Sequence, residues 1–211
     1  MQNLIFFIFF VSFQRRMRIL GFCTFPDRMI YIIMGVSGSG KTSLGTFLSE
    51  KLGWPFYEGD NFHPQENIKK MACGEPLTDQ DRFPWLLRLH EVIERERCSG
   101  SDALVACSAL KRLYRQILLH GSTAVAPNIC PHHISPSSPE VFFLYLHGDY
   151  DLIHQRMVAR QGHYMKADLL RSQFDILEPP SDEENVLTLD IRRSLGEMVL
   201  EVEKHIESLK L

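Results

Sequence analysis

The sequence carries little net charge. Its 23 Lys and Arg face 26 Asp and Glu, which gives a formal net charge of −3 over 211 residues. Domains that bind nucleic acid through its phosphates usually have a clear basic excess. The composition therefore gives no sign of a nucleic-acid partner, and we expect none.

Cysteine is scarce and irregularly spaced. The five cysteines stand at positions 23, 73, 98, 107 and 130, and none forms a Cys-x-x-Cys pair. An odd, scattered set argues against a disulfide framework and a zinc site, and predicts reduced thiols in a cytoplasmic protein. The cluster Cys130-Pro-His-His133 offers metal ligands without a fourth at usable spacing, so we favour a solvated surface loop over a metal site.

Apolar runs long enough to cross a membrane are missing. The run from Leu4 to Phe13 is about half the roughly 20 residues that a membrane-spanning helix needs. The arginines near it follow the run, whereas a secretory signal peptide carries its positive charge in front. We therefore expect residues 1–28 to be an extension outside the fold, with Met29 as the functional start. A short membrane-associating or targeting role for Leu4–Phe13 stays open as the alternative.

We expect residues 29–211 to form a single domain. A glycine-rich motif stands just after the first apolar run of this domain. It matches G-x-x-x-x-G-K-[ST] and is made of Gly35, Val36, Ser37, Gly38, Ser39, Gly40, Lys41 and Thr42. An apolar strand precedes it and a helical pattern follows, which favours a phosphate-binding P-loop over a chance glycine-rich turn. We expect Lys41 to reach the β- and γ-phosphates of ATP and Thr42 to ligate Mg²⁺.

Apolar segments and helical patterns alternate along the rest of the chain. The expected strands are 29–34, 55–60, 103–107, 141–146 and 185–190. This alternation predicts an α/β fold with a central five-stranded parallel sheet and helices on both faces. Residues 121–140 break the pattern and are expected to form an irregular insert loop.

The acceptor in such a fold binds beyond the carboxyl ends of the strands. Asp60 follows the second expected strand, where it could orient or deprotonate an acceptor hydroxyl or hold Mg²⁺ through water, although a helix-capping role is the alternative. Arg82, Lys111 and Arg115 suit an anionic acceptor, but each alone is more often an ordinary surface charge. Arg156 and Arg160 share one helix face and could offset charge on the transferring phosphoryl group, with surface charge again as the alternative.

No acidic residue ends the third expected strand, where Cys107-Ser108 stands instead. Many P-loop enzymes carry a Mg²⁺-orienting aspartate there. Its absence argues against a motor-type or switch-type ATPase and favours a small-molecule kinase. In such a kinase, Mg²⁺ is held mainly by the P-loop threonine, the nucleotide and water.

Six motifs between about Ile30 and Ile206 resemble the gluconokinase family in order and spacing. They are the P-loop, Gly59-Asp60-x-x-His63-Pro64-x-x-Asn67, Gly74-x-Pro76-Leu-Thr-Asp-x-Asp81-Arg82-x-Pro84-Trp85, Cys107-Ser-Ala-Leu-Lys111-x-x-Tyr114-Arg115, Arg160-x-Gly162-His163-Tyr164 and Gln173-Phe-x-x-Leu-Glu-Pro179. The extension 1–28 has no counterpart in the family core, and Tyr164 stands where the family often has phenylalanine.

The resemblance implies ATP-dependent phosphorylation of D-gluconate at its 6-hydroxyl, giving 6-phospho-D-gluconate for the pentose phosphate pathway. It also implies an adenylate-kinase-like P-loop fold, a small lid at about residues 156–168, Mg²⁺ and a homodimer. The implied catalytic residues are Lys41, Asp60, Arg156 and Arg160. The implied substrate-binding residues are Asp60, His63, Arg82, Ser108, Lys111, Arg115 and His163.

Two other functions stay open. A related small-molecule kinase would phosphorylate shikimate or another sugar acid. A non-catalytic nucleotide-binding module would bind ATP without turning over an acceptor, although Lys41, Asp60 and the two lid arginines are all present.

Overall fold

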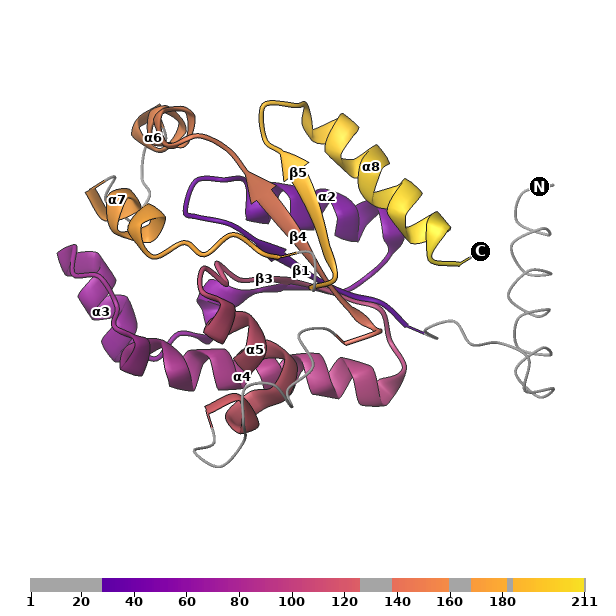
Figure 1. Cartoon of the computed structure of the whole chain (residues 1–211), viewed down its shortest axis with the longest axis horizontal. Helices are drawn as coiled ribbons and strands as arrows, with labels where there is room; N and C mark the ends of the chain where they lie inside the picture. Colours follow the sequence, from indigo (N-terminus) through magenta and orange to yellow (C-terminus); the bar gives the residue numbers. More distant parts are fainter. Residues whose placement is uncertain (1–27, 126–137, 160–167, 182–183, 211) are drawn as a thin grey trace.

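The fold is known from a computed structural model that describes residues 28–125, 138–159, 168–181 and 184–210. Five parallel strands form its centre in the order β2-β3-β1-β4-β5 (Figure 1). The strands are β1 (Ile30–Met34), β2 (Phe56–Glu58), β3 (Ala103–Ala106), β4 (Val141–His147) and β5 (Val186–Asp190). The predicted α/β class with a five-stranded parallel sheet is confirmed.

Strand β1 lies in the middle of the sheet and is fully buried. Successive side chains of a strand point to opposite faces. Tyr31 and Ile33 accordingly enter one hydrophobic core, while Ile30, Ile32 and Met34 enter the other. Both faces are covered, so the strand reads as a continuous apolar run rather than an alternating one.

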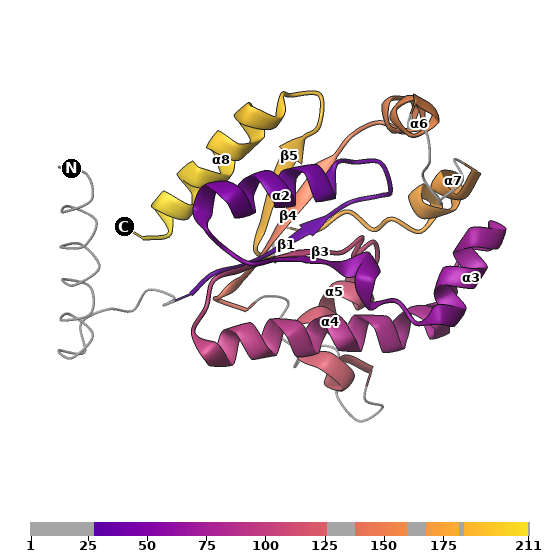
Figure 2. The ribbon, with the colours of Figure 1, turned by 180° about the vertical axis from the view of Figure 1, so that it is seen from behind.

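Helices cover the two faces of the sheet (Figures 1 and 2). One layer holds α2 (Lys41–Leu52) and α8 (Leu195–Ser208), and the other holds α4 (Asp79–Ser99) and α5 (Arg112–His120). Three further helices lie towards the carboxyl end of the sheet: α3 (Gln65–Cys73), α6 (Tyr150–Ala159) and α7 (Asp168–Asp175). Short 3-10 helices, η1 (Gly59–Phe62) and η2 (Gly121–Val125), complete the described elements.

The second strand is shorter than predicted. It ends at Glu58, and the chain turns into η1 at Gly59 instead of continuing to Asp60. The backbone passes so close to β3 that a Cβ at Gly59 would lie 2.1 Å from the Ala106 carbonyl oxygen. The Gly59 carbonyl in turn accepts a 2.8 Å hydrogen bond from Trp85 Nε1. Glycine at this position therefore lets the chain pass close to β3, and the following η1 places Asp60 at the end of the sheet.

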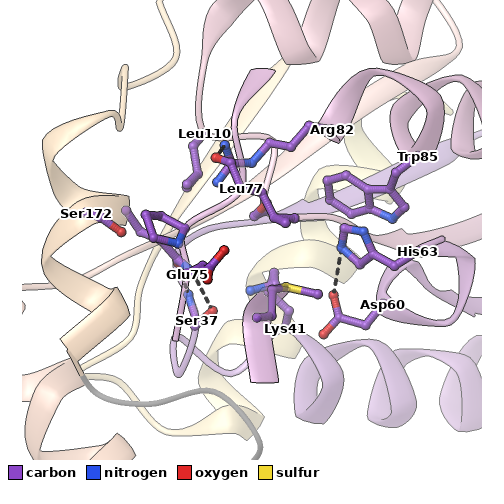
Figure 3. A pocket seen from close by; sticks show the side chains of 14 residues that line it. Ser37, Lys41, Asp60, His63, Glu75, Leu77, Arg82, Trp85, Leu110 and Ser172 are labelled. Carbon is purple, nitrogen blue, oxygen red and sulfur yellow. Dashed lines mark hydrogen bonds and ion pairs between the residues drawn. The ribbon is translucent and has the colours of Figure 1, made fainter. Parts of the chain in front are cut away.

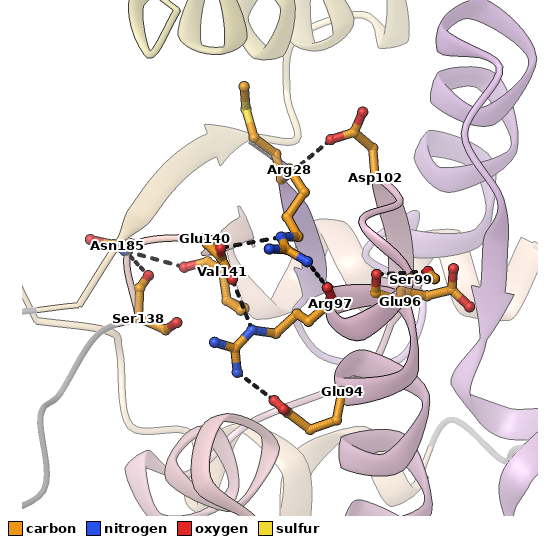
Figure 4. Close-up of polar contacts among 11 residues, drawn as sticks. Arg28, Glu94, Glu96, Arg97, Ser99, Asp102, Ser138, Glu140, Val141 and Asn185 are labelled. Carbon is orange, nitrogen blue, oxygen red and sulfur yellow. Dashed lines mark hydrogen bonds and ion pairs between the residues drawn. The ribbon is translucent and has the colours of Figure 1, made fainter. Parts of the chain in front are cut away.

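The first described residue already contacts the fold (Figure 4). The Arg28 guanidinium pairs with Glu140 at 3.2 Å and donates to the Arg97 carbonyl. The Met29 backbone N–H donates to Asp102 at 2.7 Å. The folded unit thus includes Arg28, one residue before the predicted start.

Three predicted features lie wholly or largely outside the described residues. They are the apolar run Leu4–Phe13, the greater part of the insert loop (126–137) and the greater part of the lid (160–167). The insert loop is not irregular throughout, because its first five residues form η2. Within the described part of the chain, no helix has both the length and the apolar character needed to span a bilayer.

Candidate functional site

The P-loop connects β1 to α2 and needs its glycines. Gly35, Gly38 and Gly40 have φ values of 142°, 80° and 105°, a region that side chains with a Cβ rarely adopt. A Cβ at Gly35 would also lie 2.9 Å from Ser39 Oγ and 3.0 Å from the Leu146 carbonyl oxygen. The sequence therefore builds a tight loop whose backbone N–H groups and following helix N-terminus favour an anion.

Lys41 reaches back across this loop. Its Nζ donates to the carbonyl oxygens of Gly35 and Val36, both at 3.0 Å. The ammonium is thus held on the loop that would bind the phosphates. A positive charge at this place can interact with the β- and γ-phosphates.

Two pockets flank the P-loop and share no lining residue. The first lies towards β2 and β3 and contains about 600 Å³ of space, part of it open solvent (Figure 3). Its lining residues are Ser37, Lys41, Asp60, His63, Met71, Glu75, Pro76, Leu77, Arg82, Trp85, Ser108, Leu110, Ser172 and Gln173. The second lies towards β5 and α8, contains about 840 Å³ including open solvent, and is lined by Gly38, Ser39, Gly40, Ser43, Arg156, Ala159, Ile191, Arg193, Leu195 and Met198. We call them the acceptor-side pocket and the nucleotide-side pocket.

Asp60 and His63 face each other in the acceptor-side pocket (Figure 3). His63 Nε2 lies 4.0 Å from Asp60 Oδ1, and the Asp60 side chain is 56% exposed. The next helix, α3, has Pro64 at its N-cap and no side-chain cap, so Asp60 does not cap it. The Asp60 side chain therefore lines the pocket and is reached by solvent there.

His63 is held as a neutral ring with a defined tautomer. The ring is buried and stacks on Trp85 at 4.1 Å, and burial lowers the pKa of His63 to about 4. The Asn67 amide Nδ2 donates to the Asp81 carbonyl at 2.8 Å and lies 3.3 Å from His63 Nδ1. Since Asn67 donates, Nδ1 accepts and the proton sits on Nε2, the nitrogen that faces Asp60.

Arg82 supplies positive charge to the acceptor-side pocket in addition to Lys41. Its Nη1 donates to the Leu77 carbonyl, and its guanidinium lies 5.6 Å from the centre of the Tyr114 ring. A planar guanidinium held in this way suits a carboxylate or phosphate ligand. Ser108 also lines the pocket.

Two of the predicted acceptor-binding cations do not line this pocket. Lys111 Nζ pairs with both Asp79 oxygens at 2.8 Å. Arg115 is buried in the core, where Nε and Nη2 pair with Glu184 at 2.6 and 3.0 Å. The prediction that Arg115 binds the acceptor has to be revised, because its charge is already paired and its side chain is 1% exposed.

Arg115 instead stabilises the backbone next to the acceptor-side pocket. Its Nη1 donates to the carbonyl oxygen of Ala109 at 3.2 Å and to that of Glu178 at 3.0 Å. Ala109 has a φ of 47°, in the region that favours glycine. The buried guanidinium thus helps to hold an unusual backbone turn between Ser108 and Leu110, two residues of the pocket wall.

Of the two predicted lid arginines, the structure describes Arg156 and not Arg160. Arg156, on α6, lines the nucleotide-side pocket and donates to the Ile191 carbonyl at 2.8 Å. Arg160 and His163 lie outside the described residues.

Glu58 is a site residue that the sequence analysis missed. It ends β2, its carboxylate interacts with the Thr42 hydroxyl, and burial raises its pKa. Among the described residues, no donor reaches its buried Oε2. Thr42 is the predicted Mg²⁺ ligand, so a carboxylate beside it could hold a metal-bound water. The available signal was an acidic residue two positions before Asp60, inside the same expected strand.

Comparisons with known proteins agree with a P-loop kinase. No protein-family model matches the chain. A probable gluconokinase of Xenopus tropicalis is 47% identical over 179 residues, covering 85% of this chain and 94% of the relative. A sugar kinase from Janibacter sp. HTCC2649 superposes with a TM-score of 0.74 at 37% identity, covering 85% of this chain and 95% of that one. A gluconokinase from Sinorhizobium meliloti 1021 gives a TM-score of 0.65 at 41% identity, with 84% and 89% coverage.

Proposed function

The chain belongs to the gluconokinase family, and we propose that it transfers the γ-phosphoryl group of ATP to the 6-hydroxyl of D-gluconate. The products would be ADP and 6-phospho-D-gluconate, which feeds the pentose phosphate pathway. The observation that carries the proposal is a single P-loop with a separate pocket on each side. One pocket can take the nucleotide while the other takes the acceptor.

The nucleotide-side pocket suits the rest of the ATP molecule. Gly38, Ser39 and Gly40 of the P-loop form one wall, while Ile191, Leu195 and Met198 give an apolar wall against which a base can pack. Arg156 adds positive charge beside the loop, whereas the Arg193 guanidinium in the same pocket is paired with Glu201. We therefore infer that Arg156 contacts the nucleotide phosphates.

The acceptor-side pocket suits a polyhydroxy acid. Gluconate carries one carboxylate, for which we propose Arg82 as the partner, and several hydroxyls, which His63, Asp60 and Ser108 can bind. His63 is neutral at pH 7 and carries its proton on Nε2, so it can donate to an acceptor oxygen without adding charge. Lys111 and Arg115 take no direct part in this proposal, because their charges are paired with Asp79 and Glu184.

Asp60 is proposed to orient and deprotonate the attacking hydroxyl. It lies in the same pocket as Lys41 and Ser37, so a hydroxyl bound to it also lies near the P-loop. A carboxylate can accept the hydroxyl proton as the new bond to phosphorus forms.

ATP-dependent kinases work with a divalent metal on the phosphates, and we propose Mg²⁺ held by Thr42 and, through water, by Glu58. The described residues contain no cluster of three or more His, Cys, Asp or Glu that could hold a metal alone. A site completed by phosphate oxygens and water needs no such cluster. When bound, Mg²⁺ would supply charge that offsets the phosphates.

Replacing Glu58 by glutamine should raise the Mg²⁺ concentration for half-maximal turnover about 10- to 100-fold, the usual effect of losing an outer metal partner. Glutamine keeps the side-chain shape and removes the charge. Mg²⁺ titrations of ADP release would measure the change, with Glu50→Gln on the exposed face of α2 as the control. An unchanged Mg²⁺ dependence would remove Glu58 from the metal site.

The function itself is tested by ADP release from ATP and Mg²⁺ with the full chain, in the presence of D-gluconate, shikimate, D-glucose or no acceptor. We expect stimulation by gluconate alone. Stimulation by shikimate alone would favour the related small-molecule kinase. Nucleotide binding without stimulated turnover would favour the binding module.

The homodimer and the cytoplasmic location stay predictions. The first rests on the family resemblance, and the second on the scattered spacing of the cysteines, none of which forms a Cys-x-x-Cys pair in the sequence.

A further inference from the structure

Gln173 joins helix α7 to the P-loop through two hydrogen bonds. The Ser37 backbone N–H donates to Gln173 Oε1 at 2.7 Å, and Gln173 Nε2 donates to Ser37 Oγ at 2.9 Å. The two residues are 136 positions apart in the sequence. An amide side chain is a donor and an acceptor at once, so it can complete both bonds without bringing charge to the loop. We call this pair the Gln173–Ser37 clasp.

The clasp closes a ring of contacts around one wall of the acceptor-side pocket. The Gly35 N–H donates to the Ser108 carbonyl at 3.3 Å, and the Glu178 N–H donates to the Leu110 carbonyl at 2.8 Å. The P-loop is therefore joined to the 108–110 turn, and that turn is joined to the segment after α7. Gln173 connects α7 back to the P-loop. Ser37, Ser108, Leu110 and Gln173 all line the pocket.

Helix α7 is a firm support for Gln173. Leu170 is fully buried in the core, and the Phe174 ring packs edge-on against Tyr150 at 5.4 Å. Arg171 stacks over the same Tyr150 ring at 4.1 Å. These contacts fix the position of the helix that carries Gln173. The two hydrogen bonds of the clasp therefore hold the P-loop in a fixed position relative to the core.

The clasp holds the part of the P-loop that faces the acceptor. Ser37 lines the acceptor-side pocket, whereas Gly38, Ser39 and Gly40 line the nucleotide-side pocket. We propose that Gln173 is a positioning residue for phosphoryl transfer. It sets the Ser37 side of the P-loop against the bound acceptor, so that hydroxyl and γ-phosphate meet in line. This inference rests on the proposed function.

Gln173→Met removes both hydrogen bonds and keeps the length of the side chain. We expect kcat with gluconate to fall about 10- to 100-fold, because small displacements of reacting groups have effects of this size. The KM for ATP should stay nearly unchanged, because the nucleotide pocket does not contain Gln173. Gln155→Met, on the exposed face of α6, is the matched control and should keep the kcat of the unaltered chain.

Ser37→Ala removes the hydrogen bond of the clasp to Oγ and keeps the backbone N–H bond to Gln173 Oε1. Gln173→Met already removes both bonds, so adding Ser37→Ala to it should cause no further loss of kcat if Ser37 Oγ acts through Gln173. An unchanged kcat in Gln173→Met would overturn the inference while the proposed function stands. A further loss of kcat when Ser37→Ala is added to Gln173→Met, or a loss of kcat that follows a lower thermal midpoint, would also overturn it. No gluconate-dependent turnover in the unaltered chain would overturn both proposals.

Discussion

Replacing Lys41 by methionine is expected to lower turnover with ATP and D-gluconate about 10³-fold, in the range seen when a charge that stabilises the transition state is removed. The Lys41 ammonium is held on the P-loop by the Gly35 and Val36 carbonyls at 3.0 Å. Methionine keeps most of the aliphatic stem and removes the charge. Initial rates of ADP release at saturating substrates would measure the loss.

The control for this substitution stands on the same helix. Lys51, near the end of α2, is exposed and pairs with Glu203 at the surface. Lys51→Met should leave kcat unchanged, since exposed ion pairs contribute little to stability. Near-normal turnover of the Lys41 variant would contradict the assignment of this loop as the phosphate site.

Replacing Asp60 by asparagine is expected to lower kcat about 10²- to 10⁴-fold, the range for loss of a general base. Asparagine fills the same space and still accepts a hydrogen bond, but it cannot take the hydroxyl proton. The KM for ATP should change little, because Asp60 lines the acceptor-side pocket and not the nucleotide-side pocket. Steady-state kinetics with both substrates varied would separate the two effects.

The matched control is Asp175→Asn, at the exposed end of α7 and outside both pockets. It should keep normal kcat. An Asp60 variant with the same kcat as this control would show that Asp60 is not the base. The proton would then have to leave through another group or through water.

The fold was largely predictable because its signals are local. The apolar strands, the helical patterns between them and the glycine-rich motif each fall within a short stretch of sequence. Asp60 could also be chosen from its place after a strand, since the carboxyl ends of parallel strands share one edge of the sheet.

The roles of charged residues were harder to predict because they depend on distant partners. Arg115 reads as a free cation near a strand end, but Glu184, 69 residues away, pairs with it in the core. Sequence spacing cannot show that such a partner exists. The sequence analysis looks for a Mg²⁺-orienting acid at the end of the third strand, whereas the acid that interacts with Thr42 is Glu58, at the end of β2. Gln173 belongs to one of the sequence motifs, but its role could not be predicted. Its contact with Ser37, 136 positions away in the sequence, forms only in the folded chain.

The two pockets on either side of the P-loop bear on the stereochemistry of the reaction. Separate pockets let both substrates bind together, with the attacking and leaving oxygens on opposite sides of phosphorus. The phosphoryl group then moves in one displacement, and no side chain has to carry it as a covalent adduct. In a single in-line displacement, the three oxygens that stay bound to phosphorus invert their arrangement around it. A γ-phosphate made chiral with oxygen isotopes would therefore reach gluconate with inverted configuration.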